Sequence, residues 1–191
     1  MKFSLPCVIF AGGKSSRMGE DKALLPFGNC KTLAEYQYKR MLTIFDMVYM
    51  STKSNKFPFK APLLFDNSND FAPTYALISI FSQLEDKALF VISVDTPFVD
   101  KNVINQILQT YEKNSYDCDA VVAKSPNGVH PLCGVYTKKV VPKLNSMINK
   151  NNHKLNLLLK ESKTYFVHFE EDSPFFNINH PEDYKAAINM A

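Results

Sequence analysis

Short apolar runs alternate with longer amphipathic stretches along most of this chain, and this alternation constrains the fold more than any other feature. Short apolar runs are typical of buried strands, and amphipathic stretches are typical of helices that cover a sheet. A strand, a helix and a second strand in succession favour parallel pairing. The sequence therefore predicts an α/β protein: one domain over residues 1–191, with three layers and a mainly parallel sheet.

The expected elements follow from the same pattern. Strands are expected at residues 6–10, 47–51, 63–65, 89–94, 120–123, 132–136 and 164–168. Helices are expected at residues 32–45, 73–84, 101–113, 138–149 and 154–162, with a last helix that begins at Pro181. Thr32 and Glu35 have the spacing of a capping box, which predicts where the first helix begins.

Charge and cysteine content exclude several functional classes. The chain has 22 basic and 19 acidic residues, a formal net charge of +3, which argues against a nucleic-acid or membrane partner, with a local cluster of charge as the alternative. Its longest strongly apolar stretch, residues 88–94, is far shorter than the ~20 residues that cross a bilayer. The four cysteines have neither C-x-x-C nor zinc-like spacing, so we expect reduced thiols and a cytoplasmic location.

A glycine-rich segment with several cations, residues 11–22, follows the first predicted strand. Glycines let successive backbone N–H groups converge on phosphate oxygens, and Arg17 and Lys22 can neutralise charge at the rim. The spacing fits neither a P-loop nor a dinucleotide-binding loop. Arginine occurs only here and at Arg40, which favours a bidentate phosphate contact for Arg17. A surface turn with solvated lysines is the alternative.

This segment also carries a family resemblance. The run Ala-Gly-Gly-x-x-x-Arg-Met-Gly-x-Asp-Lys at residues 11–22 resembles the signature of the molybdenum cofactor guanylyltransferases, in the nucleotidyltransferase superfamily of Rossmann-like fold. Residues 93–98 (Ser-Val-Asp-Thr-Pro-Phe), 130–132 (His-Pro-Leu) and 177–183 (Asn-Ile-Asn-x-Pro-Glu-Asp) fit the same family in the right order. The resemblance implies GMP transfer from GTP to molybdenum-molybdopterin, with Mg²⁺ as cofactor. It also implies protein partners that deliver the pterin and accept the product.

Asp95 directly follows the predicted strand 89–94 and would lie at the carboxyl edge of the sheet, where open α/β folds bind ligands. Mg²⁺ binds through one or two carboxylates together with substrate phosphates, so one aspartate can suffice. A turn aspartate before Pro97 is the alternative. The resemblance makes Asp95 the metal ligand and places it with Arg17 and Lys22 as the catalytic residues.

The resemblance also implies a nucleotide-binding set. Its members are Phe10, Ala11, Gly12, Gly13, Lys22, Ser51, Asp66 and Asp95. An aspartate can accept from N1–H and the exocyclic amine of guanine, whereas adenine has no matching edge, so Asp66 suits guanine. For Ser51 and Asp66 the alternative is a polar residue that merely ends a strand.

Candidates for the second substrate lie near the end of the chain. Asn177 and Asn179 would project from one face of an extended segment and present amides to phosphate or to metal-bound water, unless they are turn residues. His153 and Lys154 are assigned to a cationic edge for the second substrate or its phosphate.

His130 is predicted to be structural rather than a catalytic base, because no serine or cysteine partner is evident from the sequence. A zinc pair with Cys133 is disfavoured, because two further ligands at zinc spacing are missing.

The chain departs from the family pattern at residues 72–77. The family usually has a Gly-Pro-Leu-x-Gly turn there, but this chain reads Ala-Pro-Thr-Tyr-Ala-Leu, without a glycine. Phe10 also replaces the usual leucine before the glycine loop. Two alternatives therefore stay open. One is a nucleotidyltransferase for another pair, such as CTP with the pterin or a nucleotide with a sugar phosphate, and the other is a nucleotide-binding module without turnover.

Overall fold

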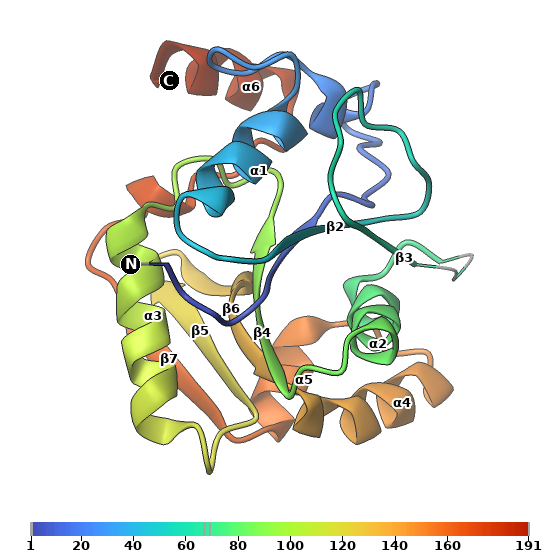
Figure 1. The fold of residues 1–191 in the computed structure, drawn as a ribbon, viewed down its shortest axis with the longest axis vertical. Helices are drawn as coiled ribbons and strands as arrows, with labels where there is room; N and C mark the ends of the chain where they lie inside the picture. The colour runs from blue at the N-terminus through green and yellow to red at the C-terminus, as the bar shows by residue number, and fades with distance from the viewer. Residues whose placement is uncertain (1, 67, 69, 191) are drawn as a thin grey trace.

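In the computed structural model, which describes residues 2–66, 68 and 70–190, seven strands form one sheet in the order β3-β2-β1-β4-β6-β5-β7 (Figure 1). The strands are β1 (Cys7–Phe10), β2 (Val48–Thr52), β3 (Leu63–Phe65), β4 (Ala88–Ser93), β5 (Ala120–Ser125), β6 (Gly128–Thr137) and β7 (Thr164–His168). All seven predicted strands are present. Only β6 differs much from its prediction, since it begins at Gly128 rather than at residue 132.

Strand order reverses at β1, which pairs in parallel with both β2 and β4. The pairs β2–β3 and β5–β7 are also parallel, whereas β6 runs antiparallel to β4 and β5. Phe10 pairs with Ser51 on one side and with Ser93 on the other. The segments that leave β1, β2 and β4 therefore start at the same edge of the sheet, where open α/β folds bind ligands.

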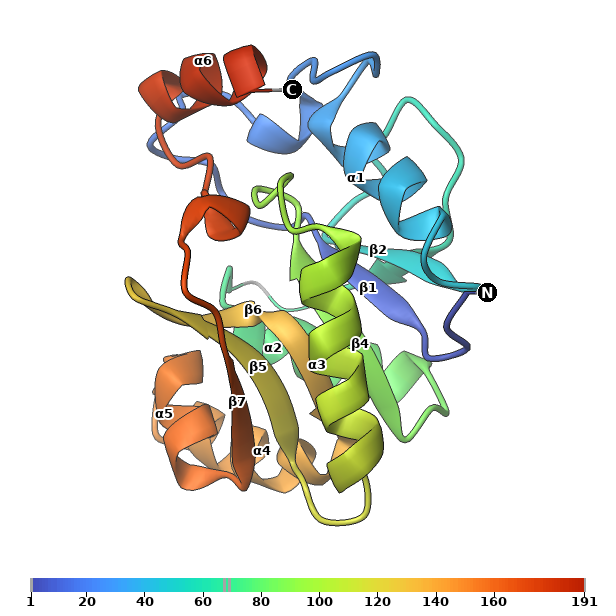
Figure 2. The same cartoon turned by 90° about the vertical axis from the view of Figure 1, so that its left-hand side faces the viewer.

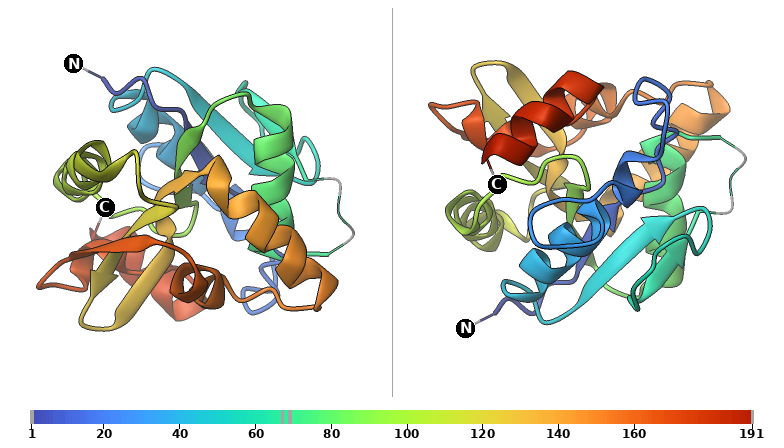
Figure 3. Two further views of the ribbon diagram at one scale, coloured as in Figure 1. Left: turned by 90° about the horizontal axis from the view of Figure 1, so that it is seen from below. Right: turned by 90° about the horizontal axis from the view of Figure 1, so that it is seen from above.

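The helices cover both faces of this sheet and form the outer layers (Figure 2). They are α1 (Leu33–Leu42), α2 (Pro73–Gln83), α3 (Lys101–Asn114), α4 (Val141–Asn149), α5 (Leu155–Glu161) and α6 (Pro181–Met190). Short 3₁₀ turns are η1 (Lys22–Leu24), η2 (Lys138–Val140) and η3 (Ser173–Phe175). Seen from below, α2 and α4 lie on one side of the sheet and α3 on the other (Figure 3). The predicted α/β fold with three layers and a mainly parallel sheet is confirmed.

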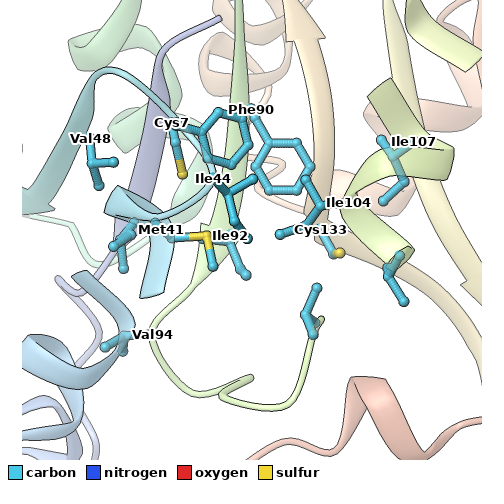
Figure 4. Packing of buried hydrophobic residues seen from close by; sticks show 14 of the residues in the cluster. Cys7, Met41, Ile44, Val48, Phe90, Ile92, Val94, Ile104, Ile107 and Cys133 are labelled. Carbon is cyan, nitrogen blue, oxygen red and sulfur yellow. The ribbon is translucent and has the colours of Figure 1, made fainter. Parts of the chain in front are cut away.

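Two hydrophobic clusters fill the space between these layers. Residues that alternate along a strand point to opposite faces, so Cys7 and Ile9 join the cluster under α1 and α3, whereas Val8 joins the cluster under α2 and α4. Figure 4 shows the first cluster, in which Phe90 lies beside Cys7, and Ile104 lies farther away beside Cys133. Both faces of the central strands are buried, which is why these strands read as continuous apolar runs.

Three local differences from the predicted helices have simple causes. The Thr32 hydroxyl accepts from Glu35 N at 3.0 Å, but the Glu35 carboxylate accepts from Lys31 N at 3.1 Å rather than from Thr32, so only half of the capping box forms. The helix ends at Leu42, before residues 43–45. The predicted helix 138–149 begins as the turn η2, and α4 starts at Val141 just before a proline.

Among the described helices, none is both long enough and apolar enough to cross a membrane.

Candidate active site

A pocket of about 330 Å³ lies at the edge of the sheet where β1, β2 and β4 end. Nine of the residues singled out from the sequence line it: Phe10, Gly12, Gly13, Arg17, Lys22, Ser51, Asp66, Asp95 and Asn179. Ala11, Asn177 and Lys154 are not among its lining residues. The structure therefore brings most of the predicted site together, from segments that lie far apart in the sequence.

The glycine loop forms one wall of the pocket, but its two leading glycines do not use left-handed backbone. The positive φ angles in the loop belong to Ser15, at 49°, and Gly19, at 76°. At Gly13 an added Cβ would meet no atom of the described residues within 4 Å. Gly12 and Gly13 therefore do not owe their place to a left-handed backbone, and Gly13 contributes open space beside its backbone; the binding of phosphate by their N–H groups stays a prediction.

The loop is fixed at both ends by Asp21 and by Lys56, a residue of the β2–β3 connection. Lys56 Nζ donates to the Ala11 carbonyl at 2.8 Å and forms an ion pair with Asp21. The Asp21 Oδ1 atom also accepts from Ala23 N at 3.1 Å and so caps η1. Ala11 is buried with its N–H donating to the Ser51 carbonyl, which explains why it does not line the pocket.

Lys22 and Asp95 form an ion pair on the floor of the pocket, and each side chain is 14% exposed. Lys22 Nζ also donates to the Ile178 carbonyl at 3.0 Å and lies 3.5 Å from Asn179 Oδ1. The other carboxylate oxygen, Asp95 Oδ1, is buried and has no hydrogen-bond partner among the described residues. Lys22 thus lies deeper than the rim position expected for it, whereas Arg17 is exposed at the mouth.

The two asparagines of the C-terminal segment behave differently. Asn179 lines the pocket, and its backbone N–H donates to Asp183 Oδ2 at 3.0 Å. Asn177 instead donates from Nδ2 to the Phe175 carbonyl at 3.4 Å. The prediction that both amides face the same site is wrong for Asn177, because the segment after η3 is not a regular strand. Ile178 N donates to the Asp95 carbonyl at 2.9 Å and ties the segment to the pocket floor.

Asp66 marks the opposite end of the pocket and is buried. Its Oδ1 accepts from Ser68 N at 3.0 Å and from Ser79 Oγ at 3.4 Å, and its Oδ2 pairs with Lys53 Nζ at 2.9 Å. Lys53 was not predicted from the sequence, although it stands two residues after Ser51, directly after β2. Its position directly after β2 places it at this edge of the sheet, but the sequence does not indicate that its side chain turns into the pocket.

The glycine-free turn contributes apolar surface between these two ends. Ala72 is the N-cap of α2 but makes no side-chain cap hydrogen bond, and Pro73 occupies the first turn. Both residues and Ala76 line the pocket. Phe71 just before them is 48% exposed, and the Nζ atoms of Lys14 and Lys53 lie 4.7 and 4.8 Å from its ring centroid.

His130 lies outside this pocket and packs against the segment that precedes Asn179. Its ring stacks on Phe175 with centroids 4.2 Å apart and an interplanar angle of 9°. The expected absence of a serine partner is wrong, since His130 Nε2 lies 2.7 Å from Ser125 Oγ. That hydroxyl also donates to Asp172. In a nucleophilic triad the aspartate contacts the second ring nitrogen of the histidine, whereas here it contacts the serine, so the three residues do not form such a triad.

His153 and Lys154 lie beside the start of α2. His153 Nδ1 is 3.0 Å from Thr74 Oγ1, and its ring stacks on Tyr75 with centroids 5.0 Å apart. Lys154 is exposed and is the N-cap of α5. Their assignment to a second substrate stays a prediction.

The cysteines show no metal-binding arrangement. Burial raises the pKa of Cys133 to about 12, which leaves an inert thiol. Across the described residues, no group of three or more His, Cys, Asp or Glu residues is placed to hold a metal ion. The zinc pair of His130 and Cys133 therefore remains without further ligands.

Acid is expected to destabilise the protein through His130. Burial lowers the pKa of His130, an effect that the charge of Asp172 partly opposes. The unfolded chain therefore binds this proton first as the pH falls through ~6.5, and the free energy of unfolding decreases below that pH. His130→Asn should remove part of this decrease in chemical denaturation between about pH 7 and 5, while the exposed His168→Asn should not. An unchanged pH profile for His130→Asn would contradict this assignment.

Comparison with known proteins places the chain in a family. A family profile described as a MobA-like NTP transferase domain matches residues 7–165. A Campylobacter jejuni protein named molybdenum cofactor guanylyltransferase is 39% identical over 183 residues, which cover 95% of this chain and 94% of that protein. A Helicobacter pylori protein of the same name is 33% identical over 193 residues, covering 98% of this chain and 93% of that protein.

A solved structure supports the fold. The crystal structure of molybdopterin-guanine dinucleotide biosynthesis protein A from Archaeoglobus fulgidus superposes with a TM-score of 0.80. The superposition covers 97% of this chain and 98% of that chain, at 19% sequence identity. At this identity the likeness concerns the fold alone.

Proposed function

This chain belongs to the MobA-like NTP transferase family, and from this membership we propose that it is a molybdenum cofactor guanylyltransferase. It transfers GMP from GTP to the phosphate of molybdenum-molybdopterin and releases pyrophosphate. The observation that carries the proposal is the pocket at the carboxyl edge of the sheet, where the glycine loop, the Lys22–Asp95 pair and Asp66 meet.

The reaction needs little covalent chemistry from the protein. An oxygen of the pterin phosphate attacks the α-phosphorus of GTP, and the bond from that phosphorus to the oxygen bridging to the β-phosphate breaks. Pyrophosphate leaves with the electron pair of this bond. Because the attacking phosphate is already an anion, catalysis consists of in-line positioning and neutralisation of charge. Consistent with this, neither histidine nor cysteine is among the described residues that line the pocket.

The triphosphate is assigned to the glycine loop and its two cations. Open space beside Gly13 lets a phosphate approach the backbone. Arg17 at the mouth can make a bidentate contact with phosphate oxygens, and Lys22 supplies a positive charge on the pocket floor. The ion pair of Lys56 with Asp21 keeps the loop in the conformation that directs Lys22 toward Asp95.

Asp95 is the residue we assign to Mg²⁺. Its Oδ1 atom is buried without a hydrogen-bond partner among the described residues, and a carboxylate oxygen is a hard ligand that suits this ion. Since no group of three or more His, Cys, Asp or Glu residues is placed to hold a metal in the described chain, the remaining ligands would be phosphate oxygens and water. When bound, Mg²⁺ supplies charge that stabilises the phosphates and the departing pyrophosphate.

Asp66 is the residue we assign to guanine selection, and this gives a first test of base choice. GTP is expected to bind at least tenfold more tightly than CTP or ATP, a difference of about 1.4 kcal/mol, because guanine places two neighbouring donors, N1–H and the exocyclic amine, against the carboxylate, whereas adenine and cytosine place one amine beside a ring acceptor that the carboxylate repels. Competition binding with the three nucleotides in magnesium should show that Asp66→Ala removes this preference. The exposed Asp46→Ala should retain it. A GTP preference that survives in Asp66→Ala would leave Asp66 as a strand-end residue.

The activity itself is tested by incubating the protein with GTP, molybdenum-loaded molybdopterin and magnesium. We expect a pterin–guanine dinucleotide by mass spectrometry and an equal amount of pyrophosphate. Dinucleotide formation from CTP, or from a sugar phosphate in place of the pterin, would favour the related transferases. Nucleotide binding without any product would favour a module without turnover.

The cellular setting is also a proposal. The four cysteines are free in the structure, which supports the reducing environment of the cytoplasm. Proteins that deliver molybdopterin and receive the dinucleotide are the proposed partners, together with the substrates GTP and molybdopterin.

A further inference from the structure

Lys53 and Asp66 place a donor and an acceptor side by side at one end of the pocket. Lys53 Nζ lies 2.9 Å from Asp66 Oδ2, and the side chains are 19% and 6% exposed. Both residues line the pocket. The pair therefore presents polar atoms to any base that enters beside the apolar turn of Ala72 and Pro73.

The remaining hydrogen-bonding capacity of this pair follows from its partners. A lysine ammonium has three N–H donors, and Lys53 uses one on Asp66 Oδ2 and one on the Ser68 carbonyl at 2.6 Å. On the carboxylate, Ser68 N and Ser79 Oγ donate to Oδ1, whereas Oδ2 accepts only from Lys53 among the described residues. One donor position on Lys53 and one acceptor position on Asp66 Oδ2 are therefore left, next to each other.

Guanine carries the complementary arrangement. Its O6 accepts a hydrogen bond and the neighbouring N1–H donates one, so the two atoms match the open donor and the open acceptor. Adenine has an amine donor at position 6 and an acceptor at N1. In the same orientation its amine would face the Lys53 donor, and its N1 would face the Asp66 acceptor. A charged donor discriminates strongly here, because a buried unpaired group is costly.

We propose that Lys53 is a second base-specificity residue, whose ammonium donates to guanine O6 while Asp66 accepts from N1–H. This inference rests on the proposed use of GTP. In this inference Lys53 does more than neutralise the charge of Asp66, because it also contacts the base. The contact of Lys53 Nζ with the Phe71 ring, at 4.8 Å from the centroid, helps to hold the ammonium at this end of the pocket.

The test compares nucleotides that differ at positions 6 and 1 of the base. GTP and ITP both carry O6 and N1–H, whereas the triphosphate of 2-aminopurine riboside has neither. Dissociation constants of the three are measured by calorimetry for the wild type, Lys53→Met and Lys53→Gln. The exposed Lys60→Met, in the same β2–β3 connection but outside the pocket, is the matched control.

In the wild type and in Lys60→Met, GTP should bind at least tenfold more tightly than the 2-aminopurine nucleotide. In Lys53→Met this ratio should fall by about tenfold, the value of one charge-assisted hydrogen bond, while the GTP to ITP ratio stays unchanged. Lys53→Gln, which keeps a neutral donor, should give an intermediate ratio. Thermal melting identifies any variant that fails to fold, and either Lys53 variant alone decides the result.

An unchanged ratio in a folded Lys53 variant would overturn the inference. Equal weakening of all three nucleotides would also overturn it, because that result indicates an ion pair that only supports the fold. A wild type that binds GTP selectively, through Lys53, but forms no dinucleotide would contradict the proposed function and leave the assignment of Lys53 intact. A wild type without preference for GTP would contradict guanine selection as a whole.

Discussion

Lys22→Met is expected to lower GTP affinity or turnover by roughly 10- to 150-fold, the equivalent of about 1.5 to 3 kcal/mol for one charge-assisted contact. Lys22 Nζ lies on the pocket floor between the Asp95 carboxylate and the Ile178 carbonyl. Methionine keeps the length and apolar stem of the side chain but removes the charge. The substitution therefore separates phosphate neutralisation from packing. Calorimetry measures the affinity for GTP, and the rate of pyrophosphate release measures turnover.

Variants of Arg17 give a second test of the phosphate contact, and a variant of Lys60 is the control. Arg17→Met should weaken GTP binding in the same direction, and Arg17→Lys should recover only part of it, because lysine cannot make the bidentate contact. Lys60→Met removes an exposed lysine outside the pocket and should leave binding unchanged. If Lys22→Met and Arg17→Met both bind GTP and turn over like the wild type, the triphosphate does not lie against the glycine loop.

Sequence pattern predicted this part of the site because its residues are adjacent to strands. Apolar runs mark β1 and β4, and the functional segments follow them directly, so parallel pairing of the two strands was enough to bring the glycine loop and Asp95 to one edge. The direct pairing of Lys22 with Asp95 was not predictable in this way. It depends on η1, which Asp21 caps and Lys56 holds in place.

Lys53 and Lys56 were missed for a related reason. Both lie in the irregular connection between β2 and β3, where no periodicity indicates the direction of a side chain. Alternation also failed at Asn177, because it assumes an extended strand and the chain after η3 turns back toward the Phe175 carbonyl.

The contact of His130 with Ser125 could not be predicted because the β5–β6 hairpin is longer than the predicted strands. The predicted strands 120–123 and 132–136 omit Ser125, whereas β5 and β6 pair as far as Ser125 and Gly128, past a bulge between Val122 and Ala123. The bulge follows from packing at Gly134, where an added Cβ would lie 2.3 Å from the Val121 carbonyl oxygen. Gly134, inside the predicted strand 132–136, is a local signal of such a close approach, but it does not indicate how far the hairpin extends.

Asp95→Asn is expected to abolish most of the magnesium-dependent turnover while the fold is retained. Asparagine has nearly the same shape and keeps an oxygen beside Lys22, so the buried packing of this residue changes little. It loses the negative charge that makes the Oδ1 atom a strong ligand for a hard cation. When turnover is measured against magnesium concentration, the maximal rate should therefore fall and the magnesium concentration for half-maximal turnover should rise. The melting temperature should stay close to that of the wild type.

The pairing with Lys22 makes a second readout necessary, because a neutral residue at position 95 also frees that lysine. GTP binding without added metal separates the two effects. If Asp95 only positions Lys22, Asp95→Asn should alter metal-free binding and leave the magnesium dependence of turnover unchanged, which would contradict its role as the metal ligand. If Asp95 holds the metal, metal-free binding should be retained or strengthened, since a carboxylate that repels the triphosphate is removed, and the response to magnesium should be lost.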